Sequence, residues 1–298
     1  MTVILKSPEG TDDLSPALTR RGVMAASIFT STFALAGPVN AQAITTPTDG
    51  LSILEPRFKG HGDYDLPAYV ARPAEAGAYP CVIVVNEIFG IHKYIKDICH
   101  RLAKLGYVAI APDFFDRAGD PSTLDFNNPE TRQQLLGIVG SANNAQVMGD
   151  VDGAIAWLEG QDFVAADRIA ITGYCWGGAV VWMASAHSAK IKAGAAWYGR
   201  MTPPPQRTED RKFPTEIAAE LKAPVLGLYA DMDNGIPLVQ VDEMRKALAA
   251  NNNPTGSRIL VFADTQHGFH ADYRPSYNKD AAERAWARML DWFKTQGV

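Results

Sequence analysis

The sequence has few cysteines, no basic run and no long uninterrupted apolar stretch. Three cysteines in 298 residues are too few for a disulfide scaffold, their spacing is not that of a zinc site, and an odd number leaves at least one free thiol. The 28 Lys and Arg against 33 Asp and Glu give a net charge of -5, with no basic cluster to follow a phosphate backbone. Nothing in the sequence therefore indicates nucleic-acid binding, a metal or a cofactor.

The first 43 residues carry the features of an export signal. Arg20 and Arg21 precede a moderately apolar stretch at 25–36, and Ala41-Gln42-Ala43 closes the segment. These are the three parts of a signal in order, and the paired arginines indicate the twin-arginine type. The apolar stretch is too short and too polar to span a bilayer. We expect removal of residues 1–43 and a periplasmic protein without stable membrane association; the alternatives are a mobile tail or an amphipathic helix on a cytoplasmic protein.

Residues 44–298 have the pattern of a single α/β domain. Two extended segments, 51–59 and 64–72, flank a Gly-rich turn and predict an antiparallel hairpin at a sheet edge. From residue 81 onward, continuous apolar runs alternate with helical patterns, which predicts a mostly parallel sheet with helices on both faces. We expect strands at 81–85, 107–111, 168–172, 193–198, 225–229 and 257–262, and helices at 95–105, 145–159, from 177, at 238–250 and from 278.

One of the three thiols lies in a motif typical of a nucleophile. Gly173-Tyr174-Cys175-Trp176-Gly177-Gly178 follows an expected strand and opens an expected helix. This is the G-x-S-x-G elbow with cysteine in place of serine, and its tight turn leaves no room for larger side chains at the glycines. The N-terminal end of the helix favours a thiolate at Cys175. The alternative is a buried thiol that only fills space in a Gly-rich turn.

The acid and the base of a triad follow the nucleophile in this order along an α/β-hydrolase chain. Asp231 and Asp233 both follow the expected strand 225–229, and either side chain is a candidate acid. His267 follows the last expected strand and is the candidate base, with His270 as its rival. The remaining histidines precede the nucleophile or follow it in its own helix, and we expect structural roles for them.

At this point four motifs resemble the dienelactone hydrolase (carboxymethylenebutenolidase) family, from about residue 50 to the C-terminus. They are Asn86-Glu87-Ile88-Phe89-Gly90-Ile91, the cysteine elbow, Gly227-Leu228-Tyr229 through Asp233-Asn234-Gly235-Ile236-Pro237, and His267-Gly268-Phe269-His270-Ala271-Asp272-Tyr273-Arg274. The resemblance implies the α/β-hydrolase fold and a triad of Cys175, Asp233 and His267. It also implies that Glu87 lies beside the resting thiol and takes its proton when substrate binds.

The resemblance further implies acyl transfer to sulfur without metal or organic cofactor. Cys175 would attack an ester or lactone carbonyl, the backbone N–H groups of Ile88 and Trp176 would hold the oxyanion, and His267 would deliver water to the thioester. Family lactonases bind a substrate carboxylate with two arginines. Arg117 fits the first position, whereas the second falls at Ala271, with only Arg274 nearby. The resemblance therefore implies hydrolysis, whereas the arginine pair that binds dienelactone is incomplete in this sequence.

Three other functions stay open on the sequence. The first is a broad carboxylesterase or thioesterase with the same residues, the second a non-catalytic ligand-binding relative, and the third a redox thiol, which no C-x-x-C motif supports. We expect a monomer acting on a small-molecule substrate. Cys81 and Cys99 are expected to be buried, and the sequence alone permits a disulfide between them.

Overall fold

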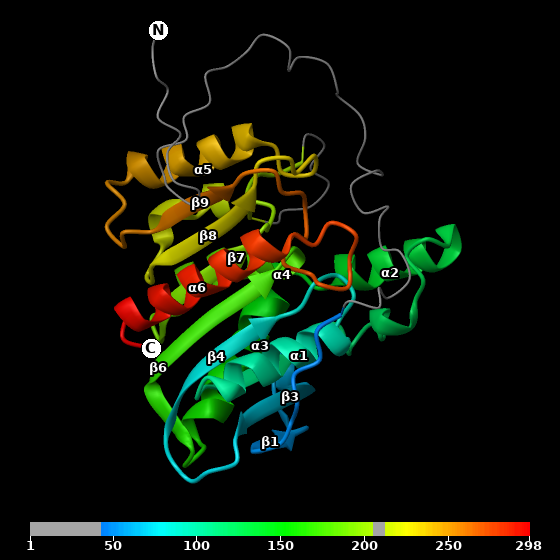
Figure 1. Cartoon of the computed structure of the whole chain (residues 1–298), viewed down its shortest axis with the longest axis vertical. Coiled ribbons are helices and arrows are strands. Elements are labelled where there is room, and N and C mark those ends of the chain that lie inside the picture. The colour runs from blue at the N-terminus through cyan, green and yellow to red at the C-terminus, as the bar shows by residue number, and fades with distance from the viewer. Residues whose placement is uncertain (1–42, 205–211) are drawn as a thin grey trace, which may run out of the picture.

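The computed structural model describes residues 43–204 and 212–298, so the expected export signal lies outside the described residues except for its last one. Within the described part, nine strands form one sheet in the order β1-β3-β5-β4-β6-β7-β8-β9, with β2 beside β3 (Figure 1). The strands are β1 (Leu51–Leu54), β2 (Arg57–Lys59), β3 (Asp65–Pro73), β4 (Tyr79–Val85), β5 (Val108–Pro112), β6 (Val164–Tyr174), β7 (Ile191–Trp197), β8 (Val225–Ala230) and β9 (Arg258–Phe262). The α-helices are α1 (Lys93–Lys104), α2 (Pro129–Ser141), α3 (Asn144–Glu159), α4 (Trp176–His187), α5 (Leu238–Ala250) and α6 (Lys279–Thr295).

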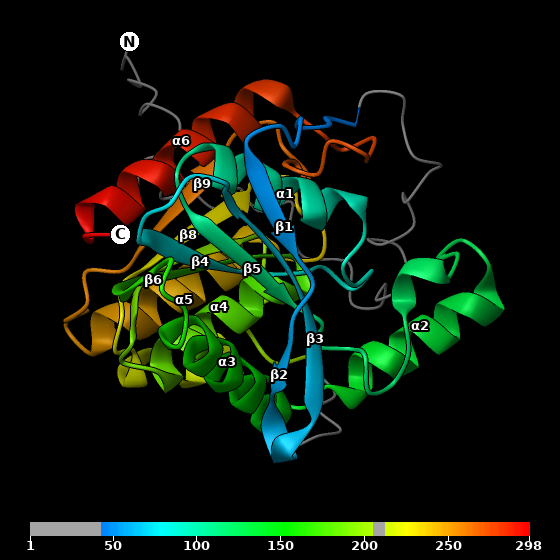
Figure 2. The ribbon, with the colours of Figure 1, turned by 90° about the horizontal axis from the view of Figure 1, so that it is seen from below.

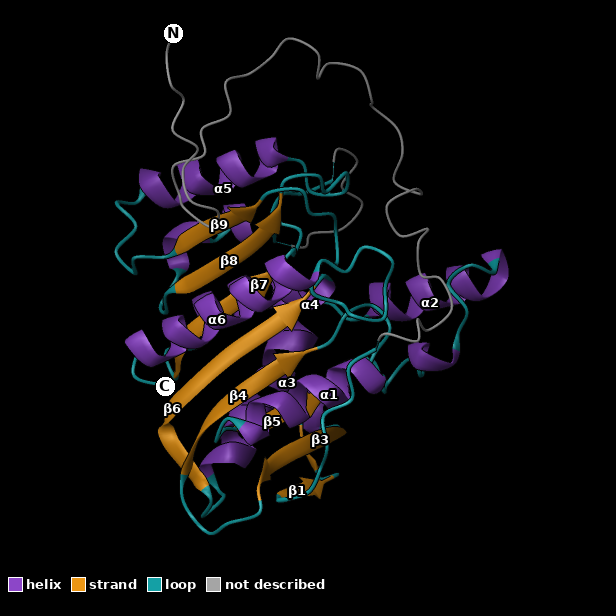
Figure 3. Ribbon diagram, viewed as in Figure 1, coloured by secondary structure: helices purple, strands orange, loops and turns teal. Residues whose placement is uncertain are grey.

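The sheet is mostly parallel, as expected. Strands β5, β4, β6, β7, β8 and β9 run in one direction, so their carboxyl ends meet at one edge (Figure 3). Strand β3 is antiparallel to β1, β2 and β5, which matches the expected edge hairpin. The expected first strand is divided into β1 and β2 near Pro56, a residue that cannot donate a ladder hydrogen bond.

Helices cover both faces of the sheet, which is why its strands are apolar throughout. Side chains alternate between faces along a strand. In β4, Val82 and Val84 pack in the core that includes α1 and α6, whereas Ile83 and Val85 pack in the core that includes α3, α4 and α5. Figure 2 shows these two helical layers on opposite sides of the sheet. The architecture is that of an α/β hydrolase.

Helix α2 was not among the expected elements. Only three of its residues are buried, Leu135, Ile138 and Val139, and it contains two glycines, so its sequence lacks a continuous apolar face. Its start does carry a signal: Asn128 caps the helix through a side-chain bond to the N–H of Glu130, and Pro129 occupies the first helical position. The helix projects to one side of the sheet (Figures 1 and 2).

The described helices include none that combines the length and the apolar character needed to cross a bilayer. Cys81 and Cys99 are both fully buried and both free, so the disulfide that the sequence permitted is not formed in the structure.

Candidate active site

Cys175 lies in the turn between β6 and α4, at the carboxyl edge of the sheet. Its backbone has φ 56° and ψ -112°, a conformation that is strained for any residue with a Cβ atom. Two hydrogen bonds hold this turn: the Cys175 N–H donates to the carbonyl of Trp197 at 3.0 Å, and the Gly178 N–H donates to the Cys175 carbonyl at 3.0 Å. The side chain is 5% exposed. The neighbouring β7 therefore fixes the strained turn.

The glycines of the motif allow the backbone to approach closely. A Cβ atom on Gly173 would lie 2.4 Å from the carbonyl oxygen of Gly177, and one on Gly177 would lie 2.4 Å from that of Val85. Atoms in real proteins do not approach so closely, so only glycine fits at these two positions. The result is that the N-terminus of α4 lies against the end of β4, with its unpaired amides and positive dipole end beside Cys175.

Asp233 and His267 form a hydrogen-bonded pair next to the elbow. The His267 Nδ1 and Asp233 Oδ2 atoms are 2.7 Å apart. The other carboxylate oxygen of Asp233 accepts hydrogen bonds from the backbone N–H groups of Gly235 at 2.8 Å and Ile236 at 3.1 Å. Asp231 accepts from the Thr265 N–H at 3.1 Å, which ties together the loops after β8 and β9. The structure thus places one of the two candidate acids at the histidine.

The charges around His267 favour its protonated form. Burial lowers the pKa of His267, but the charge of Asp233, the interaction with Cys175 and hydrogen bonds to both outweigh burial and raise that pKa from 6.5 to about 10. Burial raises the pKa of Asp233. The charge and hydrogen bond of His267, together with the hydrogen bonds from the two amides, outweigh burial, so the pKa lies below its usual value. The three side chains therefore form one connected line of carboxylate, imidazole and sulfur.

His270, the rival base, lies in a different environment. Its Nδ1 atom shares a 2.6 Å hydrogen bond with the Tyr94 hydroxyl, and its ring stacks between those of Tyr174 and Trp286. Burial holds the pKa of His270 well below its usual value, so this ring stays neutral. We assign it a packing role.

Glu87 follows β4 and is fully buried in a polar cluster. Its carboxylate accepts from the Tyr273 hydroxyl at 2.6 Å and from the Arg274 guanidinium at 2.9 Å, and it lies 3.4 Å from the Nε2 atom of His92. Burial raises the pKa of Glu87, yet the charge of Arg274 and the hydrogen bonds from His92 and Tyr273 lower it to about 2. The carboxylate is therefore ionised and fully paired. The sequence placed Arg274 near the site but did not predict that it binds Glu87.

The two expected oxyanion donors, the N–H groups of Ile88 and Trp176, lie on neighbouring segments of backbone. Ile88 follows Glu87 and is buried, and Trp176 is the first residue of α4, whose N–H has no partner within the helix. The contact of Gly177 with the end of β4 brings these two segments together. The Trp176 ring packs against Phe115, with 4.7 Å between ring centroids.

Arg117 is not gathered around Cys175. Its guanidinium binds both oxygens of Asp150 on α3, at 2.7 and 2.8 Å, donates to the carbonyl of His61 and covers the ring of Tyr64. Asp150 is fully buried and needs this counter-charge. The expected substrate-binding arginine thus serves as an ion-pair partner between α3 and the turn before β3.

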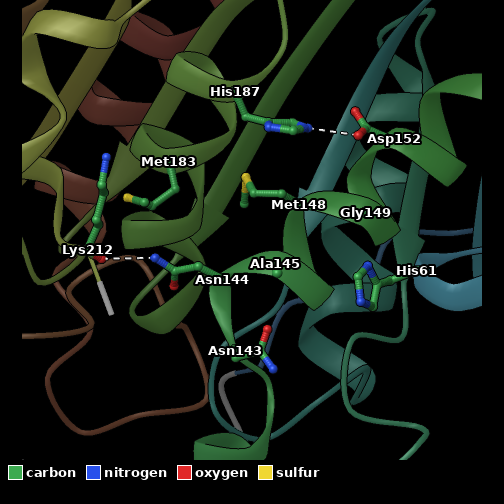
Figure 4. Close-up of a pocket in the computed structure, with 10 residues that line it drawn as sticks. All are labelled: His61, Asn143, Asn144, Ala145, Met148, Gly149, Asp152, Met183, His187 and Lys212. Carbon is green, nitrogen blue, oxygen red and sulfur yellow. Dashed lines mark hydrogen bonds and ion pairs between the residues drawn. The ribbon is translucent and has the colours of Figure 1, made fainter. Parts of the chain in front are cut away.

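A cavity of about 770 Å³ lies apart from the triad, beside α3 and α4. Figure 4 shows Met148 and Met183 facing it, with the ion pair of His187 and Asp152 (2.7 Å) at one side. No triad residue lines this cavity. In the described part of the chain, no group of three His, Cys, Asp or Glu side chains is placed to bind a metal ion.

Comparisons with known proteins bear on the family. The sequence model of the dienelactone hydrolase family matches residues 66–297. A protein of Methylorubrum extorquens named "Putative carboxymethylenebutenolidase" is 45% identical over 283 residues, 94% of each chain. A Bradyrhizobium protein named "Probable 2-oxo-3-(5-oxofuran-2-ylidene)propanoate lactonase" is 31% identical over 76% of this chain and 88% of its own. The crystal structure of a Klebsiella pneumoniae protein titled "Putative Dienelactone Hydrolase" superposes with a TM-score of 0.75, at 42% identity, over 82% of this chain and 98% of that one.

Proposed function

The chain belongs to the dienelactone hydrolase family and is a hydrolase of ester or lactone bonds, and we propose that it acts through Cys175 and a thioester acyl-enzyme. One observation carries this proposal: the strained elbow holds Cys175 beside an imidazole that is itself bound to Asp233. Such a line of groups places an imidazolium where it can give a proton to the leaving oxygen and, once neutral, take one from water.

In the acylation half, the Cys175 sulfur attacks the carbonyl carbon, and the oxyanion accepts hydrogen bonds from the N–H groups of Ile88 and Trp176. When the intermediate collapses, the C–O bond breaks, a thioester forms, and His267 gives a proton to the leaving oxygen. In the second half, His267 takes a proton from water, whose oxygen attacks the thioester. The acid leaves, Cys175 is released as a thiolate, and it recovers its proton from Glu87. Throughout, Asp233 orients the imidazole and stabilises its charge.

The role of Glu87 as acceptor of the thiol proton is implied by resemblance to the family and is part of this proposal. A carboxylate whose pKa is about 2 is a poor base for a thiol. Glu87 would therefore accept that proton only after its contact with Arg274 is loosened, for example by an anionic group of the substrate that competes for the guanidinium. Substrates with a carboxylate near the scissile bond would then activate the enzyme.

The names of the relatives suggest the substrate class. One is named for a butenolide and another for a lactone that carries a propanoate group. We propose an unsaturated lactone or ester bearing a carboxylate, with Arg274 as the cation in the site. A broad carboxylesterase or thioesterase is the second candidate, favoured because Arg117 is already paired with Asp150 and Arg274 with Glu87.

A substrate panel with matched variants tests the proposal. Wild type, Cys175→Ala and Cys175→Ser are assayed on paired neutral and carboxylate-bearing esters and lactones, with Cys99→Ala as the control thiol. We expect hydrolysis to vanish in Cys175→Ala, to be severely impaired in Cys175→Ser and to persist in Cys99→Ala. Equal rates in wild type and Cys175→Ala would refute the assignment of Cys175 as the nucleophile. Equal kcat/KM for neutral and anionic members would favour the broad esterase.

We also propose that the enzyme works in the periplasm after twin-arginine export, on the basis of the N-terminal sequence features. Fractionation of cells that express the full chain, with Arg20→Lys and Arg21→Lys together as the control, tests this. We expect the shortened protein in the periplasmic fraction and the unprocessed control in the cytoplasm. Wild-type protein retained at full length in the cytoplasm would contradict export.

A further inference from the structure

The chain just after the expected cleavage point is bound by two buried carboxylates. The backbone N–H of Thr46 donates to Asp97 Oδ1 at 2.5 Å, and the backbone N–H of Ile44 donates to Asp272. Asp97 lies on α1, and Asp272 lies in the loop between β9 and α6. They are 5% and 1% exposed. The backbone N–H groups of Ile44 and Thr46 therefore attach this segment to the body of the domain.

The cluster contains more negative than positive charge. Arg101 lies between the two carboxylates: its Nε atom donates to Asp97 Oδ2 at 2.6 Å, and its Nη2 atom donates to Asp272 Oδ2. One guanidinium thus serves two carboxylates. The nearby lysines of α1 have other partners, since Lys96 pairs with Glu55 and Lys104 with Asp49. Buried charges are ordinarily balanced, so with both carboxylates ionised the cluster lacks one cation. In keeping with this, burial raises the pKa of Asp272 despite its contact with Arg101.

We propose that removal of residues 1–43 leaves Ile44 as the N-terminus and that its new α-ammonium group supplies this missing cation, as an ion pair with Asp272. The nitrogen that would carry the charge is the one that already donates to Asp272, so the ion pair forms without rearrangement. A charged donor also makes a stronger hydrogen bond than an amide. The inference rests on the export proposed above.

The position of Asp272 connects this ion pair to the active site. Asp272 immediately precedes Tyr273 and Arg274, the two residues that hold Glu87, and follows His267 by five positions. A processed N-terminus would therefore stabilise the loop that carries the catalytic base. In the precursor, the nitrogen of Ile44 is an uncharged amide. The loop would therefore be less stable until export is complete.

The test compares two chains released from fusions by a site-specific protease: one begins at Ile44, the other at Asn40, which moves the ammonium group four residues away. Thermal unfolding is followed at pH 7 and pH 9.5. We expect the Ile44 chain to have a midpoint about 2–4 °C higher at pH 7. Pairing raises the pKa of the α-amino group above its ordinary value of about 8, so the advantage is present below pH 8 and is lost as pH rises through the raised value.

Three groups near the carboxylates are shifted away from this pH range, because the pKa of His100 is lowered and the pKa values of Cys99 and Tyr277 are raised. The advantage should also disappear when Asp272→Asn is placed in both chains. Asp97→Asn serves as the second variant, should Asp272→Asn fold poorly. Equal midpoints at pH 7, or a difference that survives pH 9.5 or both substitutions, would overturn the ion pair.

The intact mass of protein exported from cells tests the processing step separately. A chain starting at Ile44 supports the proposal, whereas any other first residue overturns it. Hydrolysis by the Ile44 chain is measured alongside, so that failure of the ion pair and failure of the catalytic proposal are distinguishable.

Discussion

Replacing Asp233 by asparagine keeps the shape of the side chain and removes its charge from the pair with His267. The charge of this carboxylate is the largest of the contributions that raise the pKa of His267 to about 10. One pKa unit corresponds to about 1.4 kcal/mol, so loss of Asp233 should remove on the order of 2–4 kcal/mol of imidazolium stabilisation. We therefore expect kcat to fall by about 30- to 1,000-fold at pH 7.

Asp231→Asn is the matched control, because Asp231 is two residues away, contacts Thr265 and leaves His267 untouched. Its kcat should stay within about threefold of wild type, since it contributes a loop contact worth about 1 kcal/mol to stability. Both variants are assayed by initial rates on one chromogenic ester, with chemical denaturation to confirm folding.

The pH dependence supplies a second readout. His267 is charged below its raised pKa in the wild type, and in Asp233→Asn the pKa falls toward 6.5, so the imidazolium is lost at a lower pH. NMR titration of the His267 ring in both proteins measures this shift. A kcat loss in Asp231→Asn as large as that in Asp233→Asn, or an unchanged His267 titration, would refute the reasoning.

The remaining predictions concern packing and buried charge. Gly177→Ala should lower activity by at least 100-fold, because its Cβ would lie 2.4 Å from a backbone carbonyl; Gly137→Ala on α2, with open space around it, is the control. Glu87→Gln should lower the unfolding free energy by about 3–5 kcal/mol in urea, because it leaves the buried guanidinium of Arg274 unpaired. In the wild type, the contribution of Glu87 is present above its ordinary pKa of 4.5 and is lost as pH falls toward 2, which acid denaturation of both proteins would detect. Arg117→Ala should cost a similar 3–5 kcal/mol in stability and change KM equally for neutral and anionic esters; a KM rise confined to anionic esters would restore its expected role in substrate binding.

The fold could be predicted, and the candidate triad residues could be located, because their determinants are local in the sequence. Apolar runs mark strands buried on both faces, and the glycines around Cys175 mark a turn that excludes larger side chains. The order of nucleophile, acid and base along the chain then follows from the order of the strands. The choice between Asp231 and Asp233 depended on family resemblance, since both follow the same strand and only the structure shows which one reaches His267.

What could not be predicted depends on contacts between distant segments. The partners of Arg117 and Arg274 lie 33 and 187 residues away, and no local pattern identifies either pair. A buried Asp150 on the apolar side of α3 was the available signal, because a buried carboxylate requires a cation. Helix α2 was missed because it buries few residues, although its Asn128-Pro129 start was visible in the sequence.

The central claim is that the acyl group passes through the sulfur of Cys175. The most direct measurement is rapid acid quenching of wild-type enzyme during turnover of an excess of a slow ester, followed by intact-mass and peptide mass spectrometry. We predict one acyl adduct per chain, located on the peptide that contains Cys175, labile to hydroxylamine and absent from Cys175→Ala. An acyl adduct on another residue would contradict this claim. Full turnover by Cys175→Ala, without an adduct, would contradict it as well.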